Sequence, residues 1–297
     1  MRKITCVVLA AIVFVSGFYA GNMYWSICKA AEASKVESEE TEELVLQTEF
    51  ESESETERVY DGVAEKESET QSETVAVGLE NTVLSKKTLK NFGGTVLTDF
   101  DVIEQYPELP TGCEITALTM VLNYYGYDVD KVTMALDYMP KVAAEFYRSE
   151  DGRLIGPDLE NYFVGDPTEE NGYICGTGAI VTAANSYLKD VGSSLTAVAM
   201  KNANADQLYD WIDRGTPVVI WCTINMEDRA ETDGWYLEDG TYMEWSTNDH
   251  GAVLIGYDED TVTVADPIYS RITVSRTQFE KIFAERGGKC VILTEEN

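Results

Sequence analysis

The feature that most constrains the fold of this chain of 297 residues is a strongly acidic segment near its N-terminus. Between Glu32 and Glu73 there are 16 acidic side chains against 3 basic ones, a net charge of −13, in runs of Glu, Ser and Thr. Such a segment repels itself and has too few apolar side chains to offset the entropy lost on folding. Residues 32–90 are therefore predicted to form a disordered linker, and the folded domain is expected at 91–297.

A basic end and an apolar run stand ahead of this linker. Arg2 and Lys3 precede the apolar residues from Ile4 to Ala20, and this order directs the following part of a chain across a membrane. Residues 1–31 are expected to form a membrane anchor, with a cleaved signal peptide as the alternative. We therefore expect the membrane to be a partner of this segment, and the domain to face the outside of the cell or to be secreted.

Within residues 91–297 a helical spacing of apolar residues gives way to β-rich runs. Helices are predicted from this spacing at 113–125, 179–188 and 205–212. After Pro217 the pattern is that of short strands, at 218–224, 252–258, 261–266, 271–275 and 289–293, with one short helix around 279–283. Helices ahead of antiparallel strands indicate an α+β domain.

The charge and the cysteine spacing exclude several classes of function. A net charge of −31 argues against nucleic-acid binding, which needs a basic surface. None of the cysteines in the domain has the close spacing of a zinc or redox site, so neither a metal nor a cofactor is predicted. Cys222 and Cys290 lie in apolar strand segments and are expected to be small buried residues. A disulfide between them stays open in an exported domain.

Cys113 is the first candidate for chemistry. It follows Gly112 and opens an amphipathic helix. The partial positive charge and free amides at a helix start favour a thiolate and lower the pKa of a thiol there. The same amides can hold an oxyanion. Cys113 is therefore the predicted nucleophile, and Cys175, which also precedes a predicted helix, is the rival.

His250 is the only histidine of the chain and lies directly ahead of the predicted strand 252–258. Asp266 ends the next strand, and the open ends of two antiparallel strands joined by a tight turn lie close together. Cys, His and Asp in this order match a papain-type triad, with His250 as base and Asp266 as the carboxylate that orients it. The neighbouring Asp249 is expected to point to the opposite face of the strand.

Two segments carry a resemblance to a known family. QYPELPTGCEITALTMVLNYYG and DHGAVLIGYDEDTVTVADP resemble the bacteriocin-processing cysteine peptidases, and more narrowly their stand-alone, double-glycine-peptidase-like members in the papain-like superfamily. The resemblance spans about residues 100–295. It implies a papain-like fold, with a helical half that carries the nucleophile ahead of an antiparallel sheet. It also implies the catalytic set Cys113, His250, Asp266 and Gln105, with Gln105 as a side-chain donor to the oxyanion hole.

The expected function is that of an exported cysteine peptidase, which cleaves an amide bond of a peptide or protein through a thioester on Cys113. One alternative is a cell-wall peptidoglycan amidase or endopeptidase, which uses similar chemistry. The other alternative is a catalytically inactive domain that binds peptides at the cell surface. Trp235 and Trp245 lie in a loop just before His250 and are expected to line a substrate groove or a lid.

Overall fold

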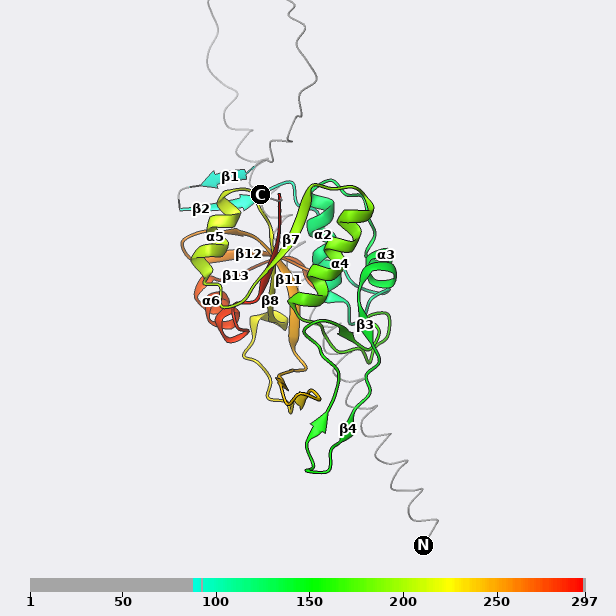
Figure 1. Ribbon diagram of the computed structural model, residues 1–297. Coiled ribbons are helices and arrows are strands. Elements are labelled where there is room, and N and C mark those ends of the chain that lie inside the picture. Colours follow the sequence, from blue (N-terminus) through cyan, green and yellow to red (C-terminus); the bar gives the residue numbers. More distant parts are fainter. Residues whose placement is uncertain (1–87, 92, 296–297) are drawn as a thin grey trace, which may run out of the picture. The chain divides into compact units, whose positions relative to one another are not determined.

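The computed structural model describes residues 88–91 and 93–295 (Figure 1). The predicted anchor at 1–31 lies outside the described residues, as does the predicted linker up to residue 87. The domain boundary predicted at residue 91 falls at the end of strand β1 (Thr88–Asn91). No helix within the described part of the chain is long and apolar enough to cross a membrane.

An antiparallel sheet lies at the centre of the domain. Its strands follow the order β1–β2–β11–β8–β14–β7, and β12 also pairs with β11 and carries β13. The strands after β1 are β2 (Gly94–Leu97), β7 (Leu195–Met200), β8 (Val218–Thr223), β11 (Asp249–Tyr257), β12 (Thr261–Asp266), β13 (Ser270–Ser275) and β14 (Cys290–Glu295). All six residues of β8 and the first eight of β11 are buried. Since alternate side chains point to opposite faces, such strands need a covering layer on each side.

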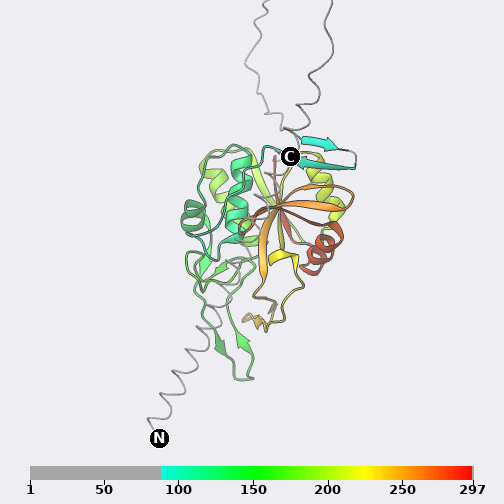
Figure 2. The same cartoon turned by 180° about the vertical axis from the view of Figure 1, so that it is seen from behind.

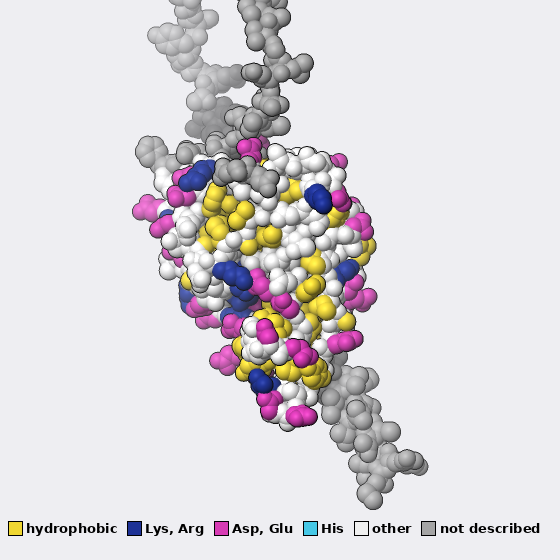
Figure 3. Space-filling view, viewed as in Figure 1, with side chains coloured by type: hydrophobic (Ala, Val, Ile, Leu, Met, Phe, Trp, Pro, Cys, Tyr) yellow, Lys and Arg dark blue, Asp and Glu magenta, His cyan; other side chains and the backbone are white. Residues whose placement is uncertain are grey.

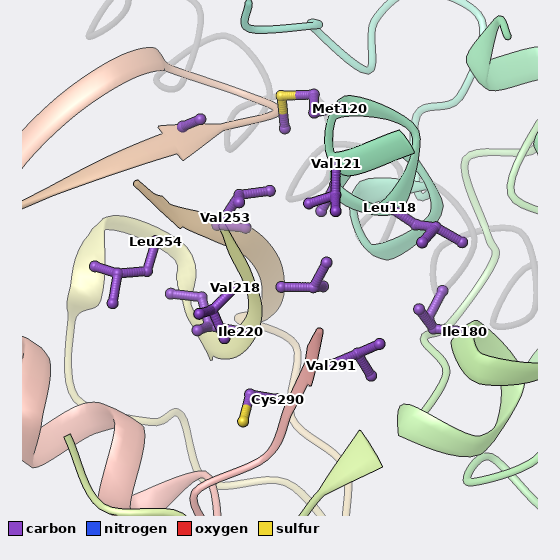
Figure 4. Packing of buried hydrophobic residues seen from close by; sticks show 14 of the residues in the cluster. Leu118, Met120, Val121, Ile180, Val218, Ile220, Val253, Leu254, Cys290 and Val291 are labelled. Atoms are coloured by element: carbon purple, nitrogen blue, oxygen red, sulfur yellow. The ribbon is translucent and has the colours of Figure 1, made fainter. Parts of the chain in front are cut away.

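Helices supply these two layers (Figures 1 and 2). On one side α2 (Cys113–Tyr124) packs on β11 and β8, and α4 (Thr177–Asp190) packs on β7 and β14. On the other side lie α5 (Ala205–Asp213) and α6 (Arg276–Glu285). Figure 4 shows Val121 of α2 in the same buried cluster as Val218 and Val253 of the sheet. The domain therefore has one main core, which holds the start of α2 close to β11.

Short elements connect these layers. A turn of α-helix, α3 (Lys131–Thr133), and a π-helical turn, η1 (Met134–Tyr138), follow α2, and a 3-10 turn, η2 (Ile224–Met226), follows β8. Residues 140–176 and 227–247, which we call the lobe, contain strands of two residues each. These are β3 (Lys141–Val142), β4 (Tyr147–Arg148), β5 (Leu154–Ile155), β6 (Phe163–Val164), β9 (Trp235–Tyr236) and β10 (Tyr242–Met243). The lobe has a small core of its own around Trp235.

The α+β prediction is confirmed, with a helical half ahead of an antiparallel sheet. The predicted helices correspond to α2, α4, α5 and α6, and the predicted strands to β8, β11, β12, β13 and β14. Most boundaries differ by one to three residues. The difference that bears on the site is in β11, which begins at Asp249 and so includes His250 as its second residue instead of starting after it. The strands of the lobe, together with β1, β2 and β7, were not predicted from the sequence.

Candidate active site

Cys113 is the first residue of α2, and its thiol points into the interface between that helix and β11. Gly112 caps the helix without a side chain, so no side-chain cap occupies the free amides of its first turn. Cys113 is 7% exposed. Its Sγ lies 3.3 Å from Glu114 Oε2, to which it donates a hydrogen bond, and accepts a hydrogen bond of 3.4 Å from the Gly251 amide. The thiol is thus tied to its own helix and to the residue that follows His250.

His250 and Asp266 form a buried pair. The antiparallel register of β11 and β12 brings the start of one strand to the end of the other, and His250 Nε2 lies 3.1 Å from Asp266 Oδ2. The other carboxylate oxygen of Asp266 accepts hydrogen bonds from the amides of Ile268 at 2.7 Å and Tyr269 at 3.1 Å. The carboxylate is therefore fixed in orientation and fixes the ring in turn. With Nε2 engaged, Nδ1 is the ring nitrogen available to take a proton.

Glu114 places a buried carboxylate beside the thiol of Cys113, and it was not predicted from the sequence. It is 1% exposed. Its Oε2 accepts from the thiol of Cys113 and its Oε1 from the Cys175 amide at 3.2 Å. A Cβ on Gly251 would lie 2.8 Å from both Cα and Cγ of Glu114, so a side chain at 251 would displace this carboxylate. The signal in the sequence was an acidic residue directly after the candidate nucleophile, in a helix with no other charged residue.

The electrostatics of the resting thiol differ from the sequence prediction. Burial raises the pKa of Cys113 well above its ordinary value, the charge of Glu114 raises it further, and the Gly251 amide opposes both. The prediction of a lowered pKa considered the helix start alone and is wrong for this resting site, because the thiol is desolvated and faces a carboxylate. Burial also raises the pKa of Glu114, and the hydrogen bonds that it accepts only partly oppose this. Burial and the Glu114 charge therefore favour the neutral thiol over the thiolate at the resting Cys113.

The pKa values of His250 and Asp266 are shifted in the directions expected for an ion pair. Burial lowers the pKa of His250, but the charge and hydrogen bond of Asp266, with the charge of Glu114, outweigh it and raise that pKa above 6.5. Burial raises the pKa of Asp266, but the charge and hydrogen bond of His250 and the two backbone amides lower it below 3.8. The net shifts favour an imidazolium next to a carboxylate.

Gln105 lies beside this pair in the loop ahead of α2. It is 2% exposed, and its amide N–H donates to the Pro267 carbonyl at 2.8 Å, next to Asp266. Its side-chain Nε2 donates to the Pro110 carbonyl at 2.9 Å, while its buried Oε1 has no hydrogen-bond partner among the described residues. The structure therefore brings all four predicted residues to one end of α2, and one N–H of Gln105 is already engaged by the loop.

The other thiols are buried and unpaired. All four cysteines of the described part of the chain are free, so the disulfide left open between Cys222 and Cys290 is not formed. Cys175, the rival nucleophile, is fully buried, and its carbonyl accepts a 2.9 Å hydrogen bond from Trp221 Nε1. It serves here as a backbone support for Glu114. Within residues 93–295 no group of three or more His, Cys, Asp or Glu side chains is arranged to hold a metal ion.

Asp249 points to the other face of β11, as strand alternation predicts. Its carboxylate receives two hydrogen bonds of 3.0 Å from Arg229, and Arg286 Nε lies 3.0 Å away in an ion pair. Two adjacent residues of one strand thus point to opposite faces of the sheet, with Asp249 facing these arginines and His250 facing Asp266. Asp249 has no part in orienting the imidazole.

Over most of the domain the chain is similar to known proteins. A family model described as the Peptidase_C39 like family matches residues 97–291. The uncharacterized protein YvpB of Bacillus subtilis (strain 168) is 32% identical over 212 residues, which cover 70% of this chain and 79% of that protein. The crystal structure of a putative C39-like peptidase from Bacillus anthracis matches with a TM-score of 0.57 and 29% identity, over 68% of this chain and 98% of that one.

Proposed function

Because this chain belongs to the Peptidase_C39 like family, we propose that it is a cysteine peptidase in which Cys113 attacks the carbonyl carbon of a peptide bond. Its fold is papain-like, with Cys113 on the helical half and His250 and Asp266 on the sheet. One observation carries the proposal. His250 forms a buried pair with Asp266, and the amide of the next residue, Gly251, donates a hydrogen bond to the thiol of Cys113.

The first half-reaction would form a thioester. The reacting form is the one in which the His250 imidazole is neutral, because only then can Nδ1 accept a proton. His250 Nδ1 then takes the proton of the Cys113 thiol as Sγ bonds to the carbonyl carbon, and the carbonyl π electrons move to oxygen. The uncapped amides at the start of α2 and the remaining N–H of Gln105 are the donors available for that oxyanion. The oxyanion then collapses, the C–N bond breaks, and the leaving amine takes the proton from His250.

The second half-reaction would restore the enzyme. His250 takes a proton from a water molecule as the water oxygen attacks the thioester carbonyl. The C–S bond then breaks, the acid product leaves, and the proton returns to Cys113. Asp266 stabilises the imidazolium in both halves without being protonated itself.

The place of action is a further part of the proposal. The basic end and apolar run at residues 1–31 support a domain that is tethered to the membrane and faces the outside, or is secreted. Peptide or protein chains in that compartment would be the substrates. Cleavage of the domain from intact cells by added protease would support this location, and protection until lysis would contradict it.

The deciding experiment offers two kinds of substrate to the full chain purified in detergent. Cleavage of a mixture of unfolded proteins, read by mass spectrometry of new termini, is expected for the native chain and not for Cys113→Ala. Release of soluble stem fragments from purified cell wall, without protein cleavage, would instead identify a peptidoglycan amidase or endopeptidase. No reaction of Cys113 with a peptide-based thiol reagent and no cleavage of either substrate would leave an inactive binding domain.

A further inference from the structure

A pocket of about 250 Å³ opens in the lobe, outside the catalytic set. Its walls are almost wholly apolar, with a single carboxylate among them, and they are formed by Phe146, Leu154, Tyr173, Asp233, Trp235 and Trp245. Figure 3 shows apolar and acidic side chains side by side on the part of the surface that lies over the short strands of the lobe. A pocket of this size takes one side chain and not a whole peptide.

The aromatic walls are built into the fold. Trp235 is 2% exposed, and its Nε1 donates to the Pro157 carbonyl at 2.7 Å. Phe146 meets it edge-on at a centroid distance of 5.0 Å. A Cβ on Gly156 would lie 2.5 Å from the Phe146 ring and 2.7 Å from Trp235, so glycine is what allows this contact. The pocket is therefore preformed, which reduces the ordering cost of binding.

The aromatic wall continues from Trp235 to the residues that open outward. Tyr173 lies edge-on to Trp235 at 5.9 Å, and Trp245 is tilted against Tyr173 at 5.0 Å. Both Tyr173 and Trp245 are half-buried, so they offer ring surface to a ligand. Ring faces attract cations as well as apolar groups.

Asp233 decides between those two kinds of ligand. It is exposed, lines the pocket, and has no ion pair or hydrogen bond with another described residue. A carboxylate without a partner beside aromatic rings favours a cationic group over a neutral one. Lysine and arginine side chains combine such a group with an apolar stem that can lie along the rings.

Both walls of the pocket lead directly to the catalytic set. Tyr173 stands two residues before Cys175, whose amide holds Glu114. Gly172 packs so closely that a Cβ there would lie 2.3 Å from Thr111 Oγ1, two residues before Cys113. From Trp245 the chain enters β11 and reaches His250 within five residues. The segments that carry Tyr173 and Trp245 therefore continue directly into those that hold Glu114 and His250.

We propose that this pocket is a specificity subsite that takes a lysine or arginine side chain of the peptide substrate. The stem of that side chain lies against Tyr173 and Trp245, and its charge lies beside Asp233. The proposal rests on the proposed peptidase function, because it assigns the pocket to the substrate of that site.

The test compares lysine with norleucine, which keeps the stem and lacks the charge. A positional peptide library offered to the full chain is expected to show lysine and arginine at one fixed distance from the cleaved bond. For the best lysine peptide, Asp233→Asn should lower kcat/KM about tenfold, while the norleucine peptide should change little. Trp245→Ala should lower kcat/KM for both peptides. The matched control is Glu231→Gln, which removes a nearby exposed carboxylate that does not line the pocket.

A second measurement does not depend on cleavage. The Cys113→Ala chain is titrated with N-acetyl-lysine amide and followed by tryptophan fluorescence, with Trp245→Phe to identify the signal. Saturable binding that Asp233→Asn weakens supports the pocket even if no peptide is cut, in which case only the peptidase function fails. Cleavage with no preference for a cationic side chain, or equal effects of Asp233→Asn on lysine and norleucine peptides, would overturn the subsite and leave the peptidase intact. Absence of both cleavage and binding overturns it as well.

Discussion

The thiol of Cys113 lies 3.3 Å from the carboxylate of Glu114, its neighbour in the sequence, and donates its hydrogen bond there. That carboxylate is buried and is held from its other side by the Cys175 amide. The resting nucleophile therefore faces a negative group that disfavours the thiolate. In the proposed reaction His250 must take the thiol proton away from this hydrogen bond before Sγ can attack a substrate.

Replacing Glu114 by glutamine should make Cys113 more reactive near neutral pH. The amide keeps the size and a hydrogen-bond acceptor but removes the charge that raises the pKa of Cys113, so that pKa should fall. The measurement is the rate of alkylation of Cys113 by iodoacetamide as a function of pH, mapped by mass spectrometry. Glu244→Gln is the control and should leave the profile in place. An unchanged midpoint in Glu114→Gln would mean that the carboxylate does not act on the thiol.

Cys113→Ala should abolish turnover while the chain stays folded, because Cys113 supplies the nucleophile and little packing at the helix start. Cys175→Ala should keep activity, since Glu114 is held by the backbone amide of Cys175 and not by its thiol. Rates of peptide cleavage, together with circular dichroism of each variant, check both expectations. Loss of activity in Cys175→Ala with retention in Cys113→Ala would reverse the assignment of the nucleophile.

The single histidine allows a direct measurement of its pKa. The raised pKa of His250 comes from Asp266 and Glu114, so Asp266→Asn should lower it. Cys113→Ala should change it less, because the resting thiol is neutral. One imidazole signal, followed by NMR in the untagged chain, reports each value. A larger shift from Cys113→Ala than from Asp266→Asn would point to a thiolate–imidazolium pair in the resting site.

The same pair should make stability depend on pH. The folded pKa of His250 is raised, so its contribution is fully present below the unfolded value of about 6.5 and is lost as pH rises through the folded pKa. The folded pKa of Asp266 is lowered, so its contribution is present above about 3.9 and is lost as pH falls through the folded value. The free energy of unfolding, measured with urea at pH 6 and at pH 9, should therefore differ more between the two pH values for the native chain than for Asp266→Asn. Equal differences would contradict the ion pair.

Gly251→Ala should damage both stability and activity. The added Cβ would lie 2.8 Å from Cα and Cγ of Glu114, and such overpacking costs about 1–3 kcal/mol. It would also push the start of α2 away from the amide that contacts Cys113. Urea unfolding and peptide cleavage by the folded fraction measure the two effects. Gly192→Ala, at a site with open space, should lose some stability from its positive φ and keep full activity.

Sequence reasoning reached Cys113, His250 and Asp266 because local patterns encode them. A helix start is visible in the spacing of apolar residues, and a tight hairpin fixes which residues meet at its open end. The surroundings of Glu114 could not be found in this way, because they are not local in the sequence. Gly251 and Cys175 lie far along the chain and meet the Glu114 side chain only in the folded domain. The lobe was missed because strands of two residues have no period to detect. Its order comes from Trp235 and its neighbours, which are brought together only by the fold.

The opposite directions of Asp249 and His250 also protect the pairing of β11. A shift of that strand by one residue would turn the carboxylate of Asp249 to the face that holds Asp266, and would turn the imidazole to the face of Arg229 and Arg286. Like charges would then meet on both faces of the sheet, without water to screen them. The two arginines, which touch no part of the triad, thereby penalise the misaligned chain and help to ensure that a newly folded molecule assembles its catalytic pair correctly.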